Sequence, residues 1–251
     1  YTGKLESMDC LVEDYVYDNL NTTSNQFIYC GINNLFGEIT WFYPTADSNV
    51  NTRSVTYSYL DSTAKRPIWF TNDSTLFTRT TWQDSAVFGL PHATQYDANT
   101  DVSFDVEGNS DGISYYYEHE TGVNQIRLNV ITAIPADITS GDYDITQKII
   151  KGAASNMADL RGDGEFIMRI SRIVPDFIFQ QNNVIAQLEV RDYPNDTAAS
   201  SPLGPFTLTP TTTKVDTRAR GRAIALTISN TAVDTSWKLG TFRLDIQAGG
   251  R

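Results

Sequence analysis

Short runs in which apolar and polar residues alternate recur along most of the chain, and turn residues separate them. In residues 53–60, Val55, Tyr57 and Tyr59 fall on one face, and mostly polar residues fall on the other. A period of two residues is typical of a half-buried β-strand. The pattern therefore predicts an all-β fold. Comparable strand-forming runs are expected at residues 26–32, 38–43, 67–70, 76–81, 113–120, 125–132, 165–173, 184–190, 223–229 and 241–247.

Two of these runs divide most clearly into a buried face and a wet face. In residues 165–173, Phe166, Met168 and Ile170 share one face. Near the C-terminal end, three apolar residues alternate with three polar ones, namely Phe242, Leu244 and Ile246 with Arg243, Asp245 and Gln247. Both runs indicate strands of a sheet that packs on a core with one face only.

The spacing of the strands suggests how the chain is organised. In residues 1–90 the strands follow one another through tight turns, as they do in a propeller blade or a sandwich, although no exact sequence repeat is present. We expect propeller-type blades of short antiparallel strands in residues 1–112. Residues 113–251 then form a further β-rich C-terminal region, which is either separate or part of the same propeller closed by the C-terminal strand.

Two local features refine this picture. The runs at 113–120 and 125–132 are expected to pair as a β-hairpin through Thr121 and Gly122. Residues 148–160 carry the one pattern that predicts a short helix, which Gly152 weakens.

Composition narrows the function classes. The 251 residues carry a net charge of −11, so the chain as a whole repels DNA and anionic membranes. This charge fits plain solubility, and it also fits the wall of a passage through which DNA slides without sticking. No stretch is apolar enough to span a membrane, and we expect no signal peptide. Because it begins with Tyr1, we expect it to be part of a longer polypeptide.

The two cysteines, Cys10 and Cys30, are too few for a disulfide scaffold or a four-thiolate zinc site. We expect both to be free, partly buried thiols. The two histidines are His92, in a turn-like segment, and His119. Strand alternation places Glu118 and Glu120 on the face opposite His119, so a structural or solvent role is expected for each histidine.

No known catalytic pattern stands out. The nucleophile elbow, the phosphate-binding loop, the dinucleotide glycines and the zinc-protease helix motif are all missing from the sequence. No pair of carboxylates suggests a glycoside hydrolase. Several aromatic residues could stack on sugars, but they are expected to form the core and rim of a β domain: Trp41, Trp69, Trp82 and residues 115–117. We therefore expect no enzymatic activity, no metal and no cofactor.

Some short matches are expected to carry no function. The alternation of Asp105, Glu107, Asn109 and Asp111 resembles a calcium loop, but position twelve of such a loop is Tyr116, so a solvated loop is expected. The remaining matches are interpreted as chance, namely the sequons at Asn21, Asn72 and Asn195 and the integrin-type tripeptide at residues 161–163.

One local basic run contrasts with the acidic whole. It consists of Lys214, Arg218, Arg220 and Arg222, and Asp216 interrupts it. Three interpretations are open: contact with a phosphate backbone, pairing with the acidic surface of a neighbouring subunit, or a solvated strand edge that basic side chains protect from unwanted pairing.

The C-terminal segment resembles a known family. Residues 218–222 (RARGR) and 237–247 (WKLGTFRLDIQ) resemble the C-terminal end of the tail tube proteins, also called nozzle or packaged-DNA stabilisation proteins, of short-tailed bacteriophages. Residues 30–43, 79–88 and 166–177 look similar to the same family, in the same order. The chain departs from the pattern at residues 133–164, where it carries an extra segment, and in the loop at 61–67.

This resemblance implies a virion protein of the phage tail, assembled in the host cytoplasm as a homohexameric ring that contains β-propellers. The ring lies below the portal and adaptor, contacts other tail proteins, and retains or conducts the genome. Members are normally longer than this chain, and the family has no catalytic residues to transfer. The alternatives are a carbohydrate-binding or receptor-binding tail module and, less favoured, a glycoside hydrolase.

Overall fold

The computed structural model of the chain describes residues 10–63, 66–74, 78–97, 112–127, 129–145, 166–193 and 200–249. In these residues the regular structure is β-strand, apart from the short helix α1 (Glu13–Tyr17) and one 3-10 helix (Thr22–Phe27). Every strand pairing is antiparallel, so the all-β prediction is confirmed. The helix expected at 148–160 lies outside the described residues. Among the described helices, none has the length and apolar character that crossing a bilayer requires.

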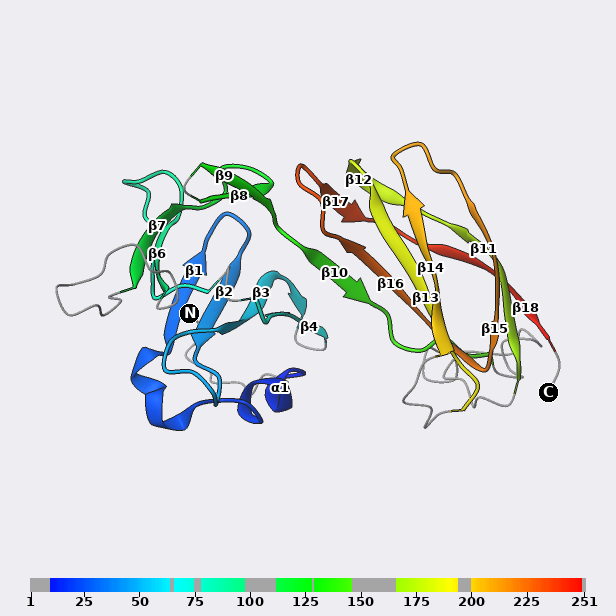
Figure 1. The fold of residues 1–251 in the computed structure, drawn as a ribbon, viewed down its shortest axis with the longest axis horizontal. Helices are drawn as coiled ribbons and strands as arrows, with labels where there is room; N and C mark the ends of the chain where they lie inside the picture. The colour runs from blue at the N-terminus through cyan, green and yellow to red at the C-terminus, as the bar shows by residue number, and fades with distance from the viewer. Residues whose placement is uncertain are drawn as a thin grey trace. The chain divides into compact units, whose positions relative to one another are not determined.

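The chain divides into two compact units, Tyr1–Thr121 and Gly122–Arg251. The strands of the first unit, shown in blue to green in Figure 1, are β1 (Tyr29–Asn33), β2 (Glu38–Tyr43), β3 (Arg53–Thr63), β4 (Arg66–Asn72), β5 (Thr81–Gln83), β6 (His92–Asp97) and β7 (Ile113–Glu118).

In the first unit, β1 to β4 form one sheet in chain order, and β5, β6 and β7 form a second. Trp82 of β5 ties the two sheets together. Its indole Nε1 donates a 2.8 Å hydrogen bond to the carbonyl of Ile32, and its own carbonyl accepts one of 3.1 Å from the hydroxyl of Tyr29. Gly31 permits this approach, because a Cβ there would lie 2.5 Å from Cγ of Trp82.

The second unit holds the remaining strands, in green to red in Figure 1. They are β8 (Asn124–Arg127), β9 (Val130–Ala133), β10 (Ala136–Thr139), β11 (Met168–Val174), β12 (Phe177–Gln181), β13 (Val184–Arg191), β14 (Ser200–Leu208), β15 (Val215–Gly221), β16 (Ala223–Asn230), β17 (Ser236–Leu239) and β18 (Arg243–Ala248).

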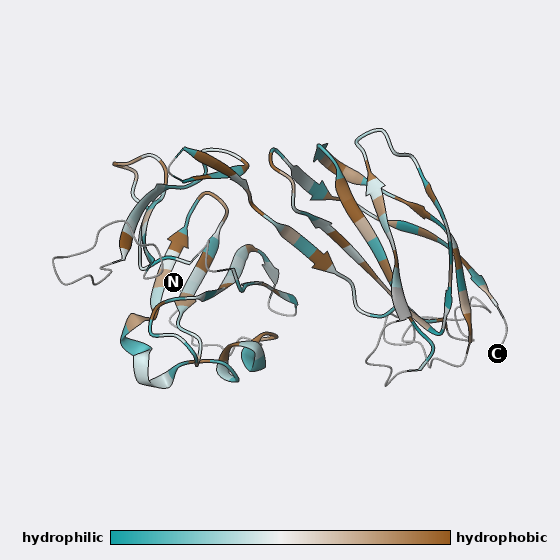
Figure 2. Cartoon of the chain, in the orientation of Figure 1, coloured by the Kyte–Doolittle hydropathy of each residue, from teal (hydrophilic) through white to brown (hydrophobic). Residues whose placement is uncertain are grey.

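Two sheets of the second unit enclose its hydrophobic core. Their strand orders are β10-β16-β13-β14 and β15-β11-β18, while β12-β17 and β8-β9 are two-stranded ribbons. Along β13, buried residues alternate with half-buried ones over the whole strand, and Figure 2 shows the matching bands of hydropathy. Met168 and Ile170 of β11 and Leu188 of β13 are fully buried in one cluster. The two sheets thus pack as a sandwich whose inner faces interdigitate.

Several expectations need correction. The hairpin expected between 113–120 and 125–132 is wrong: β7 pairs with β6, and residues 124–133 fold back on themselves as β8 and β9, with Asn129 at a φ of +63° between them. The segment containing His92 is the start of β6 rather than a turn. Of the strand expected at 76–81, residues 78–80 are not in a strand, β5 begins at Thr81, and residues 76 and 77 lie outside the described residues.

The expectations for the two cysteines and for the propeller agree with the structure only in part. Cys10 and Cys30 are free, as predicted, but both are exposed rather than partly buried. The described strands form several small antiparallel sheets, and within the described residues these sheets do not close into a ring of blades.

Candidate basic interface

The basic run of the sequence lies on an edge strand of the sandwich. Buried and exposed positions alternate along this strand, which explains why small residues alternate with arginines. Along β15 the small residues Thr217, Ala219 and Gly221 are buried, while Arg218 and Arg220 are exposed. Gly221 lies so close to Val190 of the opposite sheet that a Cβ would clash with it. The sequence R-A-R-G-R therefore places small residues against the core and projects arginines from the outer face.

A further arginine, from β11, joins this face. Arg169 lies directly opposite Arg220 of β15 and, on its other side, opposite Gln247 of β18. Arg169, Arg218 and Arg220 are exposed, and among the described residues they form no ion pair. Like charges directly opposite each other destabilise a sheet. We call Arg169, Arg218 and Arg220 the basic face.

The other end of the same sheet is neutralised. A register shift after Ile170 brings Arg172 opposite both Asp216 and Asp245, and its guanidinium reaches them at 3.1 and 3.3 Å. Lys214 approaches Asp216 at 3.5 Å. The hydrogen bond from Arg172 lowers the pKa of Asp216, and Lys214 contributes to the same shift. Among the described arginines of this sheet, those without a carboxylate partner are therefore the three of the basic face.

A hollow of about 320 Å³ borders the basic face. Its lining consists of Ile167, Asp192, Tyr193, Arg220 and Arg222. The side chain of Tyr193 is 70% exposed. Exposed tyrosine beside arginine is the composition found at the energetic centres of protein–protein interfaces.

The structure divides the four residues that the sequence singled out. Arg218 and Arg220 belong to the basic face, Arg222 lies just beyond β15 in the hollow, and Lys214 belongs to the neutralised end. Sequence reasoning missed Arg169 and Tyr193. The alternation of residues 165–173 could have placed Arg169 on the wet face, but the pairing of β11 with β15 could not be read from the sequence.

The two histidines have structural partners. Nε of Arg79 donates to Nε2 of His119 at 3.0 Å, and the ring of His119 packs on Trp82 with centroids 4.4 Å apart. Burial, together with the charge of Arg79, lowers the pKa of His119 to about 4. Nδ1 of His92 lies 2.6 Å from the hydroxyl of Tyr116.

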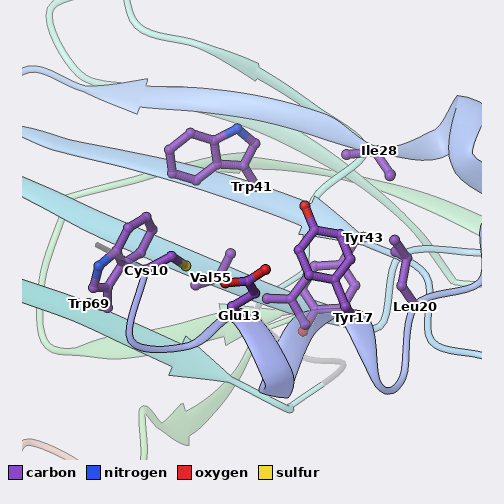
Figure 3. A pocket seen from close by; sticks show the side chains of 10 residues that line it. Cys10, Glu13, Tyr17, Leu20, Ile28, Trp41, Tyr43, Val55 and Trp69 are labelled. Carbon is purple, nitrogen blue, oxygen red and sulfur yellow. The ribbon is translucent and has the colours of Figure 1, made fainter. Parts of the chain in front are cut away.

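Trp41 and Trp69 line an apolar pocket of about 260 Å³ in the first unit (Figure 3), where α1 covers the sheet of β1 to β4, and Trp82 lies outside this pocket. Trp41 and Trp69 lie on its wall with ring centroids 6.2 Å apart. Glu13 is the one charged residue in the lining. Sugar binding requires several polar groups that converge on the ligand, so this pocket gives little support to the carbohydrate-binding alternative.

Within the described part of the chain, no group of histidine, cysteine and carboxylate side chains could hold a metal ion. The loop that resembles a calcium site, at 105–111, and the tripeptide at 161–163 lie outside the described residues. The sequence matches no protein-family model, and no curated protein matches it significantly.

Proposed function

We propose that this chain is a structural subunit of a bacteriophage tail that assembles with copies of itself into a ring, the nozzle or hub. The ring continues the DNA channel below the portal and retains or conducts the genome. The observation that carries this proposal is the exposure of apolar side chains on the two-stranded ribbons.

On the ribbon of β8 and β9, Ile126 lies directly opposite Ile131, and their side chains are 63% and 57% exposed. On β12, Ile178 and Phe179 are also exposed. A two-stranded ribbon alone is only marginally stable in water. Exposed apolar patches on such ribbons mark surfaces that another protein covers, which supports an assembly subunit rather than a free monomer.

Propeller blades remain part of the proposal. The sheet of β1 to β4 has four antiparallel strands in consecutive order, as one blade of a propeller has. Further blades would come from other parts of a longer polypeptide or from neighbouring subunits.

The acidic charge suits a channel for DNA. With a net charge of −11, the assembled subunits would repel phosphates from the channel wall, so DNA would pass with few attractive contacts. We expect carboxylates to outnumber lysines and arginines on the wall. The partners of the ring would be the portal or adaptor above it and other tail proteins, and its location would be the virion.

Cryo-electron microscopy of purified virions tests this proposal. Density for this chain in a homohexameric ring around the DNA channel at the capsid vertex supports it. Density at the tip of a receptor-binding fibre, together with glycan binding by the isolated chain, would favour the carbohydrate-binding alternative, and a basic channel wall would contradict the passage mechanism.

A further inference from the structure

The first unit carries a cluster of carboxylates. Its charge is opposite to that of the basic face, which belongs to the second unit. Asn33, Glu38 and Ser58 lie in one row across β1, β2 and β3. The amide of Asn33 donates a 2.8 Å hydrogen bond to Oε1 of Glu120, and the hydroxyl of Ser58 donates one of 3.2 Å to Oδ2 of Asp61. Neutral donors of the row therefore hold two further carboxylates near Glu38. We call Glu38, Asp61 and Glu120 the acidic row.

Among the described residues, no cation neutralises the negative charges of the acidic row. Burial raises the pKa of Glu38, and the carboxylates of Glu120 and Asp61 raise it further. Among the described residues, none of the three carboxylates has an ion pair with lysine, arginine or histidine. Cations supplied by another molecule would relieve this repulsion.

Exposed apolar residues surround the acidic row. They indicate that the molecule that supplies the cations is a protein. The turn between β1 and β2 presents Leu35 and Phe36, and Leu60 of β3 packs on Gly37 of the same turn. The side chains of Leu35 and Leu60 are 62% and 65% exposed. Apolar side chains beside charged ones are the usual composition of a protein–protein interface.

We propose that the basic face of one copy of this chain, with Tyr193 beside it, binds the acidic row of a second copy. Three arginines without carboxylate partners face three carboxylates without cationic partners, so the two surfaces match in sign and in number. The inference rests on the proposed self-assembly and deepens it. A contact between two different surfaces can repeat head-to-tail from copy to copy, and such contacts close into a ring when the rotation between copies allows it.

A protein partner fits the basic face better than DNA does. The chain as a whole repels phosphates, and Asp192 and Gln247 border the arginines. A carboxylate surface that carries its own apolar rim meets both the arginines and the exposed ring of Tyr193. DNA binding is the competing outcome that the experiment must distinguish.

A reciprocal charge swap in the full chain tests the contact. Variant A is Arg218→Glu/Arg220→Glu, and variant B is Asp61→Lys/Glu120→Lys; all four positions are exposed. Each variant alone brings like charges together at the contact, so its self-association should weaken about tenfold or more by mass photometry. An equimolar mixture restores opposite charges at every contact, so assemblies should return in the mixture.

Matched controls carry the same changes in charge elsewhere on the exposed surface. Lys214→Glu/Arg243→Glu, at the neutralised end of the sheet, matches variant A, Glu118→Lys/Asp137→Lys matches variant B, and both should assemble like the wild type. Circular dichroism with thermal unfolding verifies that each variant is folded.

The outcomes separate this inference from the proposed function. If the wild type assembles and variants A and B assemble equally well, the head-to-tail contact is wrong while the proposed ring stands. The same conclusion follows if folded variants fail to assemble and their mixture does not recover, or if variant A loses only duplex DNA binding. A wild type that never assembles contradicts the proposed function as well.

Discussion

Arg169 of β11 and Arg220 of β15 lie directly opposite each other in the antiparallel register, so two exposed guanidinium groups share one row of the sheet. A sheet selected only for stability would not place like charges there. Proteins accept such a cost where function requires it.

Removing one of the two charges should stabilise the isolated chain. We expect Arg169→Gln to raise the free energy of unfolding by about 0.2–1 kcal/mol, because it removes the repulsion from Arg220. Urea denaturation at low salt measures the change, which should shrink near 1 M salt, where the Debye length is about 3 Å. The control Arg172→Gln removes the partner of Asp216 and Asp245 and should lower stability slightly. An equal loss of stability in both variants would argue against repulsion at Arg169.

The close approach of Trp82 to Gly31 should make this glycine intolerant of a side chain. In Gly31→Ala the new methyl group would overlap Cγ and Cβ of Trp82, at 2.5 and 2.8 Å, and hydrogen bonds hold that residue at both its indole and its carbonyl. We expect a loss of about 1–3 kcal/mol in the free energy of unfolding. Gly122→Ala, with open space around it, should be neutral or slightly stabilising. A neutral Gly31→Ala would mean that the two sheets separate more easily than described.

The half-buried His119 should make the first unit sensitive to acid. Its pKa in the folded state is about 4, below the ordinary value of 6.5, so between these values the unfolded chain binds a proton that the folded chain does not. Stability is therefore greatest above pH 6.5 and falls as the pH drops towards 4, by about 3 kcal/mol in all. His119→Gln keeps an acceptor for Arg79 but cannot titrate, so the difference between its pH–stability curve and that of the wild type isolates this effect. Parallel curves would contradict it.

The exposed isoleucines of the β8–β9 ribbon should serve assembly rather than folding. Ile126→Thr/Ile131→Thr should change the free energy of unfolding by no more than about 0.5 kcal/mol, because both side chains are mostly exposed. The same variant should weaken self-association in mass photometry. The contrasting control, Leu188→Ala in the sandwich core, should lose about 2–5 kcal/mol. A large loss of stability in the isoleucine variant would show that the ribbon packs within the chain.

The sequence predicts single strands better than their partners. Alternation located β2, β3, β13 and β16 to within a few residues, because local periodicity reports which side chains face a core. It missed β6, β10, β12, β14, β15 and β17. In β15 the inward residues are threonine, alanine and glycine, so their burial leaves no apolar signal.

The pairing of distant strands explains the remaining differences. The basic face requires β15 to lie beside β11, and its contacts join residues such as Arg172 and Asp216 that are far apart in the chain. No local pattern encodes that register. The acidic row likewise depends on the register of β1, β2 and β3, and on hydrogen bonds from Asn33 and Ser58 that strand patterns do not predict.

Mass photometry of the purified 251-residue chain across a range of concentrations tests whether the chain assembles into a ring. We expect a discrete closed oligomer, with the mass of a homohexameric ring, that dissociates as salt screens the contact between the basic face and the acidic row. A single monomeric species at every concentration and at low salt would contradict it.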